Sequence, residues 1–164
     1  FDMLPILEKD KNVEIFVPDT LGLTYVFRFN WKQPPFNDVR YRRAAALALN
    51  QKDFLQASIG DPRYYKVCKA MFGCGTPLES SAGMAGALES RFDESKKLLK
   101  ELGYDGTPIV VLQSTDVANL VNMAPVAKTL LERSGATVSL ANQAPPRSGA
   151  IVRVSWPRTF ILNR

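Results

Sequence analysis

Histidine is absent from this sequence of 164 residues, and cysteine occurs only twice. A chain without histidine cannot build a Ser-His-Asp triad, and it lacks the most frequent general base and zinc ligand of proteins. Two cysteines alone would fill only half of a tetrahedral zinc site. The sequence therefore predicts no metal site, no cofactor and no catalytic residues of the common hydrolase kind.

Long apolar runs are also missing. No stretch approaches the roughly 20 apolar residues that span a bilayer, and residues 1–10 lack the basic and apolar regions of a signal peptide. Because the chain starts with Phe1, we expect its start to be a processed end or an arbitrary cut. The missing signal peptide thus carries no information about the compartment.

Acidic residues are lacking from the last part of the chain. The net charge of +5 and the pI of 9.3 therefore arise mainly from that part. Glu132 is the last acid, and the part of the chain after residue 141 still carries four arginines: Arg147, Arg153, Arg158 and Arg164. The 21 basic residues less these four leave 17 against 16 acidic residues, so the body is nearly neutral. We expect no nucleic-acid partner, because binding phosphates requires a clustered basic face.

The remaining composition is ordinary. The chain has a mass of 18.2 kDa, 46% hydrophobic and 23% charged residues, and a mean hydropathy of −0.10. These values are typical of one compact globular domain with a hydrophobic core.

The two cysteines, Cys68 and Cys74, lie in the segment KVCKAMFGCGTP, where Gly73 and Gly75 supply backbone freedom. A local disulfide is sterically reasonable and would contribute about 2 kcal/mol in an exported protein. Two reduced thiols explain the same residues equally well. Around this pair, residues 60–91 show no sustained periodicity, and we expect a long irregular segment there.

The clearest strand signal lies in residues 23–30, where aromatic and aliphatic side chains alternate with a second, mixed face. Val26 and Arg28 lie on that mixed face, which can look toward solvent or a cleft. A second strand is expected over residues 13–20, after a short helical stretch at residues 3–7.

A helix is predicted from Asp38 to Gln51, with Asn37 or Asp38 as its cap. Its first turns carry three arginines, whose charge opposes the helix dipole: Arg40, Arg42 and Arg43. We therefore expect at least one of them to pair with a carboxylate elsewhere. A second helix is predicted from a cap at Asp93 to Leu102.

A β-α-β unit is predicted in residues 107–141, with strands at 108–113 and 136–141 and a helix over 117–134. The strands should be parallel, and ligands of such sheets bind beyond the carboxyl ends of the strands. This rule indicates a site at residues 113–116, which include Ser114 and Thr115. A plain helix cap by Thr115 or Asp116 is the alternative.

Three segments in order resemble one protein family. They are FRFNWKQPPFNDVRYRRAAALALNQKDF at residues 27–54, FDESKKLLKELGYDG at 92–106 and VAKTLLERSGATVSL at 126–140. Together they resemble the extracellular solute-binding proteins of family 5, which serve peptide and nickel ABC importers, over residues 1 to about 140. The resemblance implies an α/β fold: one truncated lobe of a two-lobed, type II periplasmic-binding-protein-like architecture, with a mixed sheet flanked by helices.

The resemblance also implies three parts of the chain. Residues 1–22 would end a first-lobe segment and cross between lobes, residues 23–140 would form part of the second lobe, and residues 141–164 would be an atypical basic tail. Within the tail, residues 150–156 could pair as an edge strand.

The implied function is that of a periplasmic or cell-surface receptor, without catalysis, that binds a peptide or related small solute. Its partners would be the membrane subunits of an ABC importer, reached through the full-length parent. Arg28 is the candidate contact for an acidic group of the ligand, with Val26 beside it and Ser114 and Thr115 at the strand end. A surface arginine paired with a neighbour is the structural alternative for Arg28.

Two other functions are compatible with the sequence. The arginines of residues 40–43 and of the tail could form a basic module for nucleic acid or an anionic surface. Alternatively, Asp38, Asp61 and Asp116 could converge in a small α/β hydrolytic enzyme, although nothing in their spacing requires it.

Overall fold

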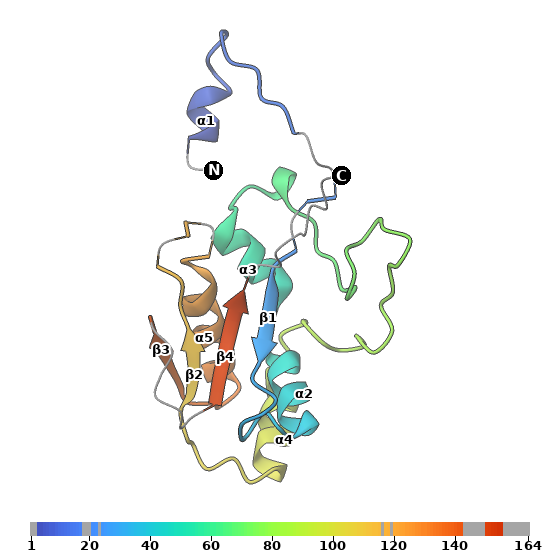
Figure 1. Cartoon of the computed structure of the whole chain (residues 1–164), viewed down its shortest axis with the longest axis vertical. Coiled ribbons are helices and arrows are strands. Elements are labelled where there is room, and N and C mark those ends of the chain that lie inside the picture. Colours follow the sequence, from blue (N-terminus) through green and yellow to red (C-terminus); the bar gives the residue numbers. More distant parts are fainter. Residues whose placement is uncertain are drawn as a thin grey trace, which may run out of the picture.

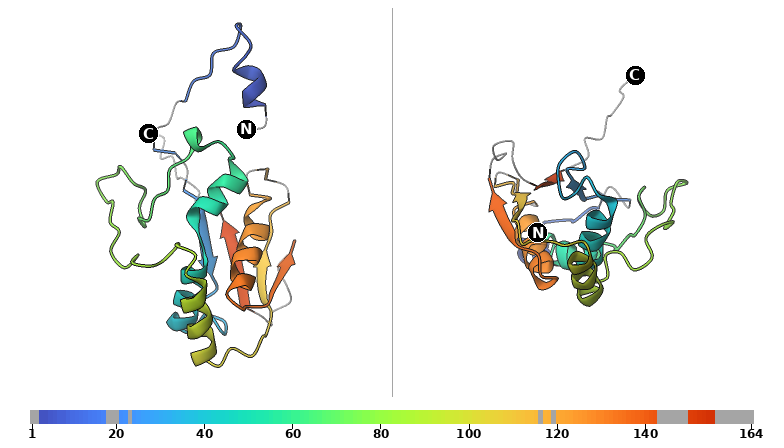
Figure 2. Two further views of the ribbon diagram at one scale, coloured as in Figure 1. Left: turned by 180° about the vertical axis from the view of Figure 1, so that it is seen from behind. Right: turned by 90° about the horizontal axis from the view of Figure 1, so that it is seen from below.

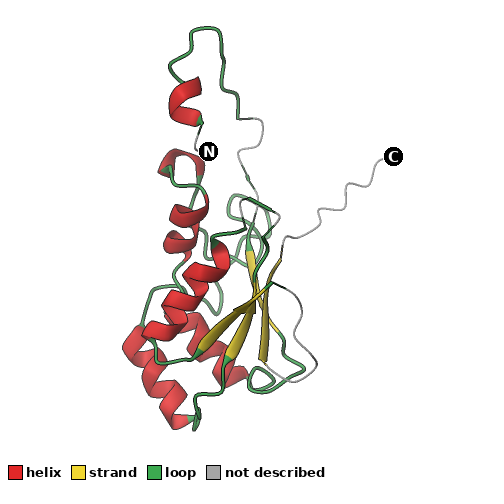
Figure 3. Ribbon diagram, turned by 90° about the vertical axis from the view of Figure 1, so that its left-hand side faces the viewer, coloured by secondary structure: helices red, strands yellow, loops and turns green. Residues whose placement is uncertain are grey.

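The computed structural model describes residues 3–17, 21–22, 24–115, 117–118 and 120–142, and the backbone of residues 150–155. Its centre is a mixed sheet with the strand order β1-β4-β2-β3. The strands are β1 (Val26–Phe29), β2 (Ile109–Leu112), β3 (Val138–Ala141) and β4 (Ala150–Ser155). The helices lie on one side of this sheet (Figure 3).

Five α-helices and one 3-10 turn occur in the described part of the chain. The α-helices are α1 (Leu4–Leu7), α2 (Val39–Ala48), α3 (Gln51–Ser58), α4 (Phe92–Glu101) and α5 (Met123–Arg133), and the 3-10 turn is η1 (Pro62–Tyr64). None of the described helices has the length and apolar character needed to cross a membrane. The α1 helix lies beyond the end of the sheet that is nearest to α3 (Figure 1).

The predicted β-α-β unit is confirmed, because β2 and β3 pair in parallel and α5 connects them. The helix is shorter than predicted, since it begins at Met123 rather than near residue 117. Pro125 lies in its first turn, where a missing N–H costs no helical hydrogen bond. Gly135 follows the helix with a φ of 90°, a conformation that favours glycine.

The strand predicted in the tail exists as β4, but it is a central strand of the sheet and not the edge strand that was expected. It lies between β1 and β2, antiparallel to the first and parallel to the second. The four longer helices of the described part, α2 to α5, lie on the same side of the sheet (Figure 3).

The single helix predicted from Asp38 to Gln51 is wrong, because the chain forms two helices there. Leu49 and Asn50 are extended, and the Asn50 side chain caps α3 by accepting a hydrogen bond from the Lys52 N–H at 2.9 Å. The last carbonyls of α2 bond to a distant segment: the N–H groups of residues 88, 90 and 91 donate to the carbonyls of residues 46, 49 and 47. This pairing satisfies carbonyls that a helix end leaves open.

Two smaller predictions also fail. Residues 13–17 form no strand, and residues 18–20 of the expected strand lie outside the described part. Asp93 does not cap α4; it lies in the first turn, where its charge still favours the helix dipole, and Arg91 occupies the cap position.

The core fills the space between the sheet and its helices. Buried side chains of β2 and β3 meet α5 and the alanine-rich face of α2, as at Val111, Val138 and Ala48. The small residues let α2 and α4 approach closely, and the buried Ser95 hydroxyl donates to the Ala44 carbonyl at 2.7 Å. The relative position of β1 and β2 is set by β4, which pairs with both strands.

Candidate ligand-binding edge of the sheet

One edge of the sheet gathers three of the four candidate binding residues. The register pairs Val26 of β1 with Ser155 of β4, and Leu112 of β2 with Arg153. Extending the second register by two residues places Ser114 level with Val26. With one strand between them, the two positions are about 10 Å apart.

Ser114 is half-buried and Thr115 is exposed, directly beyond the carboxyl end of β2. Pairing continues to the strand end, because the Gln113 N–H donates to the Ala141 carbonyl at 2.8 Å. Thr115 is too far from the start of α5 at Met123 to cap it, so the helix-cap interpretation of Thr115 is wrong. Asp116 lies outside the described residues.

Arg28 lies on the face of β1 opposite to the core, as the alternation of residues 23–30 predicted. Its neighbours Phe27 and Phe29 pack against the core, whereas Arg28 is exposed. Among the described residues, no carboxylate or carbonyl pairs with its guanidinium. Arg28 is two residues, about 7 Å, farther from the sheet edge than Val26.

A shallow hollow of about 470 Å³ opens beside Arg28, lined also by Phe29, Trp31, Asn37 and Arg42. The Arg42 guanidinium donates to the Phe36 carbonyl at 2.5 Å and to the Asn37 carbonyl at 3.2 Å, so it is held in place. Trp31 is 65% exposed at the rim, with the Lys32 ammonium 5.7 Å from its ring. This hollow therefore presents cations and an aromatic surface.

Sequence reasoning missed Trp31, Asn37 and Arg42 as neighbours of Arg28. An aromatic residue in the turn after a strand was a visible signal for Trp31. The structure thus separates the four candidates into two places: Val26, Ser114 and Thr115 share the sheet edge, and Arg28 lines the hollow at the following turn.

Two of the carboxylates considered for an enzymatic function have local partners. Arg40 pairs with Asp38, the residue that caps its own helix, at 2.6 Å, so its partner is local rather than distant. Side-chain hydrogen bonds from Arg40 lower the pKa of Asp38. Asp61 pairs in the same way with Arg63 at 2.5 Å, and these hydrogen bonds lower the pKa of Asp61.

The two cysteines are joined in the structure. A disulfide links Cys68 and Cys74 in the irregular segment that follows η1. This loop projects from the layers of sheet and helices (Figures 1 and 2).

The sequence is similar to those of known periplasmic binding proteins. The chain is 34% identical, over 142 residues, to a probable peptide ABC transporter periplasmic-binding protein of Sinorhizobium fredii; the match covers 85% of this chain and 27% of that protein. It is 29% identical to the periplasmic oligopeptide-binding protein OppA of Escherichia coli, with 84% of this chain and 26% of that protein covered. The chain therefore spans about a quarter of the length of these curated relatives.

The fold matches solved structures as well. The ABC transporter substrate-binding protein CtaP of Listeria monocytogenes superposes with a TM-score of 0.68 at 21% identity, over 81% of this chain and 29% of that protein. The fold is that of a truncated lobe of a type II periplasmic binding protein.

The model of the bacterial extracellular solute-binding proteins, family 5, matches residues 2–156, beyond residue 140 where the recognisable motifs end. The match covers nearly the whole chain, and the expected α/β lobe is present, so the family membership is established. This chain belongs to the bacterial extracellular solute-binding proteins of family 5.

Proposed function

We propose that this chain forms part of one lobe of a periplasmic or cell-surface receptor that binds a peptide or a related small solute. The full-length parent would deliver the solute to the membrane subunits of an ABC importer. The match of the family-5 model to residues 2–156 carries this proposal. The relative from Sinorhizobium fredii, named for peptide transport, supports the solute class.

Within the lobe, we propose that the ligand meets the sheet edge at Val26, Ser114 and Thr115. Two hydroxyl groups beside a strand end can exchange hydrogen bonds with peptide groups of a ligand. Arg28 would take an acidic group, because its guanidinium is exposed and has no partner among the described residues. A charge-assisted hydrogen bond of this kind is the strong polar contact that such a site needs.

The carboxylates support recognition over hydrolysis. Asp38 and Asp61 cap different elements, and each is ion-paired with its own arginine. Their lowered pKa values keep them ionised at neutral pH, which is unsuited to a general acid. In the ranges that the structure describes, no group of three or more metal-binding side chains gathers.

Two of the three arginines in residues 40–43 have local partners, which counts against the basic-module alternative. Arg40 is neutralised by Asp38, and Arg42 bonds to backbone carbonyls of its own helix start. Arg147, Arg158 and Arg164 lie outside the described residues.

Titration calorimetry of the full-length parent with a series of peptides tests the proposal. Arg28→Ala should weaken binding of acidic ligands about 10- to 100-fold, the range for losing a hydrogen bond to a charged group. Arg43→Ala is the matched control, because Arg43 is exposed on α2 and does not line the hollow. Unchanged affinity of Arg28→Ala for every bound peptide would remove Arg28 from the site, and a parent that binds no solute would refute the receptor function.

A further inference from the structure

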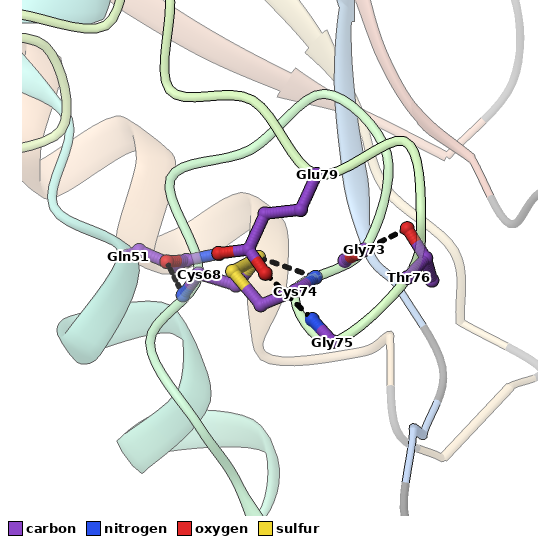
Figure 4. Close-up of a disulfide and its surroundings, with 7 residues drawn as sticks. All are labelled: Gln51, Cys68, Gly73, Cys74, Gly75, Thr76 and Glu79. Carbon is purple, nitrogen blue, oxygen red and sulfur yellow. Dashed lines mark hydrogen bonds between the residues drawn. A yellow bond between two sulfur atoms is a disulfide. The ribbon is translucent and has the colours of Figure 1, made fainter.

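The disulfide closes a compact loop whose interior is bonded at several points (Figure 4). The Cys74 N–H points at the Cys68 sulfur at 2.9 Å, and the Gly75 N–H donates to the Glu79 carboxylate at 2.8 Å. The Thr76 hydroxyl donates to the Gly73 carbonyl at 2.8 Å. The loop thus has a defined shape, which we call the disulfide loop, residues 68–76.

This disulfide loop is attached to the helical layer on one side. The Cys68 N–H donates to the Gln51 side-chain oxygen at 2.7 Å, at the first residue of α3 (Figure 4). Lys69 forms an ion pair with Glu89, next to the segment that bonds to the end of α2. Movement of the disulfide loop is therefore restrained by α2 and α3.

On its other side, the disulfide loop contacts the segment that leads into β1. A Cβ atom built on Gly75 would lie 3.3 Å from a methyl carbon of Leu21, and one built on Gly73 would lie 3.8 Å from the Thr24 hydroxyl oxygen. The contact at Gly75 is tight, so a side chain there would displace Leu21 slightly, whereas the one at Gly73 is an ordinary van der Waals distance. Gly75 also has a φ of 85°, which favours glycine on conformational grounds.

A second group of contacts joins the preceding turn η1 to the start of the chain. Arg63 pairs with Glu8 at 2.8 Å. Tyr64 lines a mostly apolar hollow of about 470 Å³ together with side chains of α1 and of residues 15–17. Residues 63–75 thus contact the chain ahead of β1 at several separate points.

We propose that the disulfide loop is a clasp that holds the chain where it enters β1, and that reducing the disulfide releases this entry segment. The clasp connects α3, through Cys68, to Leu21 and to Thr24. Thr24 lies two residues before Val26. It therefore sets the position of the proposed ligand edge, a consequence that rests on the proposed function. Redox state would control how firmly that edge is held.

Reduction is chemically simple. A dithiol reductant such as dithiothreitol supplies two electrons, the S–S bond breaks, each cysteine sulfur takes up one proton, and the reductant closes to its own disulfide. Hydrogen exchange of the full chain, oxidised and reduced, then reports local opening. The amides of β1, which pairs with β4, should exchange at least about tenfold faster after reduction, because the released entry segment no longer holds the start of that strand, while those of α5 keep their rates.

Two results would overturn the clasp. One is faster exchange confined to residues 68–76, with the amides of β1 unchanged. The other is an equal increase in α5, which would show that the disulfide stabilises the whole fold rather than the entry segment.

A glycine pair isolates the contact without touching the disulfide. Gly75 and Gly83 both have positive φ values, 85° and 77°, but a Cβ on Gly83 would meet nothing within 4 Å. Ala at either position strains the backbone, whereas only Gly75→Ala presses on Leu21. Faster exchange of the β1 amides should appear in Gly75→Ala alone; the same change in Gly83→Ala would count against the clasp.

The exchange experiments use this chain without a solute, so their outcome is independent of ligand binding. Calorimetry of the full-length parent with a peptide, oxidised and reduced, tests the link to the ligand edge. Weaker binding after reduction is expected. Equal affinity in both states would show that the clasp does not affect the ligand edge. If the oxidised parent bound no peptide, the receptor function would be refuted, and the exchange experiments alone would decide whether the clasp exists.

Discussion

The body of the lobe and its long irregular excursion are held together by different physical means. The body consists of the sheet with α2, α4 and α5, and its centre is apolar: Val111, Ala127 and Leu131 are 0%, 0% and 1% exposed. The excursion, residues 60–91, instead exposes Met71 and Phe72 at 82% and 55%. Its order depends on a disulfide, ion pairs and backbone hydrogen bonds to α2 and α3.

This difference teaches where the free energy of folding resides. Burial of apolar area stabilises the body, and each side chain removed there leaves a cavity. The excursion gains little from burial, so cross-links and polar contacts must offset the entropy of ordering it. Paired substitutions, one in each region, can test the contrast directly.

The largest contrast is expected between two phenylalanines. Phe36 is 1% exposed, and its ring centroid lies 4.8 Å from that of Phe29, whereas Phe72 is 55% exposed in the disulfide loop. Phe36→Ala should lower the free energy of unfolding by about 3–5 kcal/mol. Phe72→Ala should change it by no more than about 0.5 kcal/mol. Urea denaturation followed by circular dichroism measures both, and a similar loss in the two variants would contradict the contrast.

A smaller effect is expected at the junction of the two regions. The Asn50 side chain caps α3 and also donates to the Ser90 hydroxyl at 3.0 Å, which joins the body to the end of the excursion. Asn50→Ala loses the cap and this bond, and should cost about 1–2 kcal/mol. Ser90→Ala keeps the cap and should cost about 1 kcal/mol or less. Equal losses in urea denaturation would mean that the cap contributes nothing.

The sequence predicted the elements whose signals are local. Alternation marked β1, and the Asp38 side chain does accept a hydrogen bond from the Arg40 N–H at 2.8 Å as a cap. The β-α-β unit was predicted because the apolar strands and the helical spacing between them all lie within one continuous segment. The family was predicted from motifs inside these same segments.

The features that sequence reasoning missed depend on residues far apart in the chain. The break after Ala48 is stabilised by N–H groups of residues 88–91, which no local pattern reveals. Strand order is equally non-local, so β4 was expected at an edge although it pairs with both β1 and β2. The strand face alone predicts an exposed Arg28, but Arg42 and Trp31 line its hollow from the next helix and turn.

The smallest effect is expected for an aspartate–arginine motif that occurs in both regions. Asp38 and Asp61 each accept a hydrogen bond from the N–H two residues later and pair with that residue's guanidinium, at the start of α2 and of η1 respectively. Hydrogen bonds from the arginine side chain lower the pKa of both carboxyls below the ordinary 3.8. The same chemistry thus serves a packed helix and an excursion.

The direction of the pH effect follows from this lowering. When the folded pKa lies below the unfolded one, the stabilisation is complete above the unfolded pKa and is lost as the pH falls through the folded pKa. Asp38→Asn should therefore flatten the decline of the urea midpoint between about pH 5 and pH 2, because its helix packs in the cooperative core. Asp61→Asn should leave that midpoint curve unchanged and instead speed amide exchange at residues 61–65, because the excursion can open locally. If both variants flattened the midpoint curve alike, the excursion would unfold together with the body, and the two regions would form one cooperative unit.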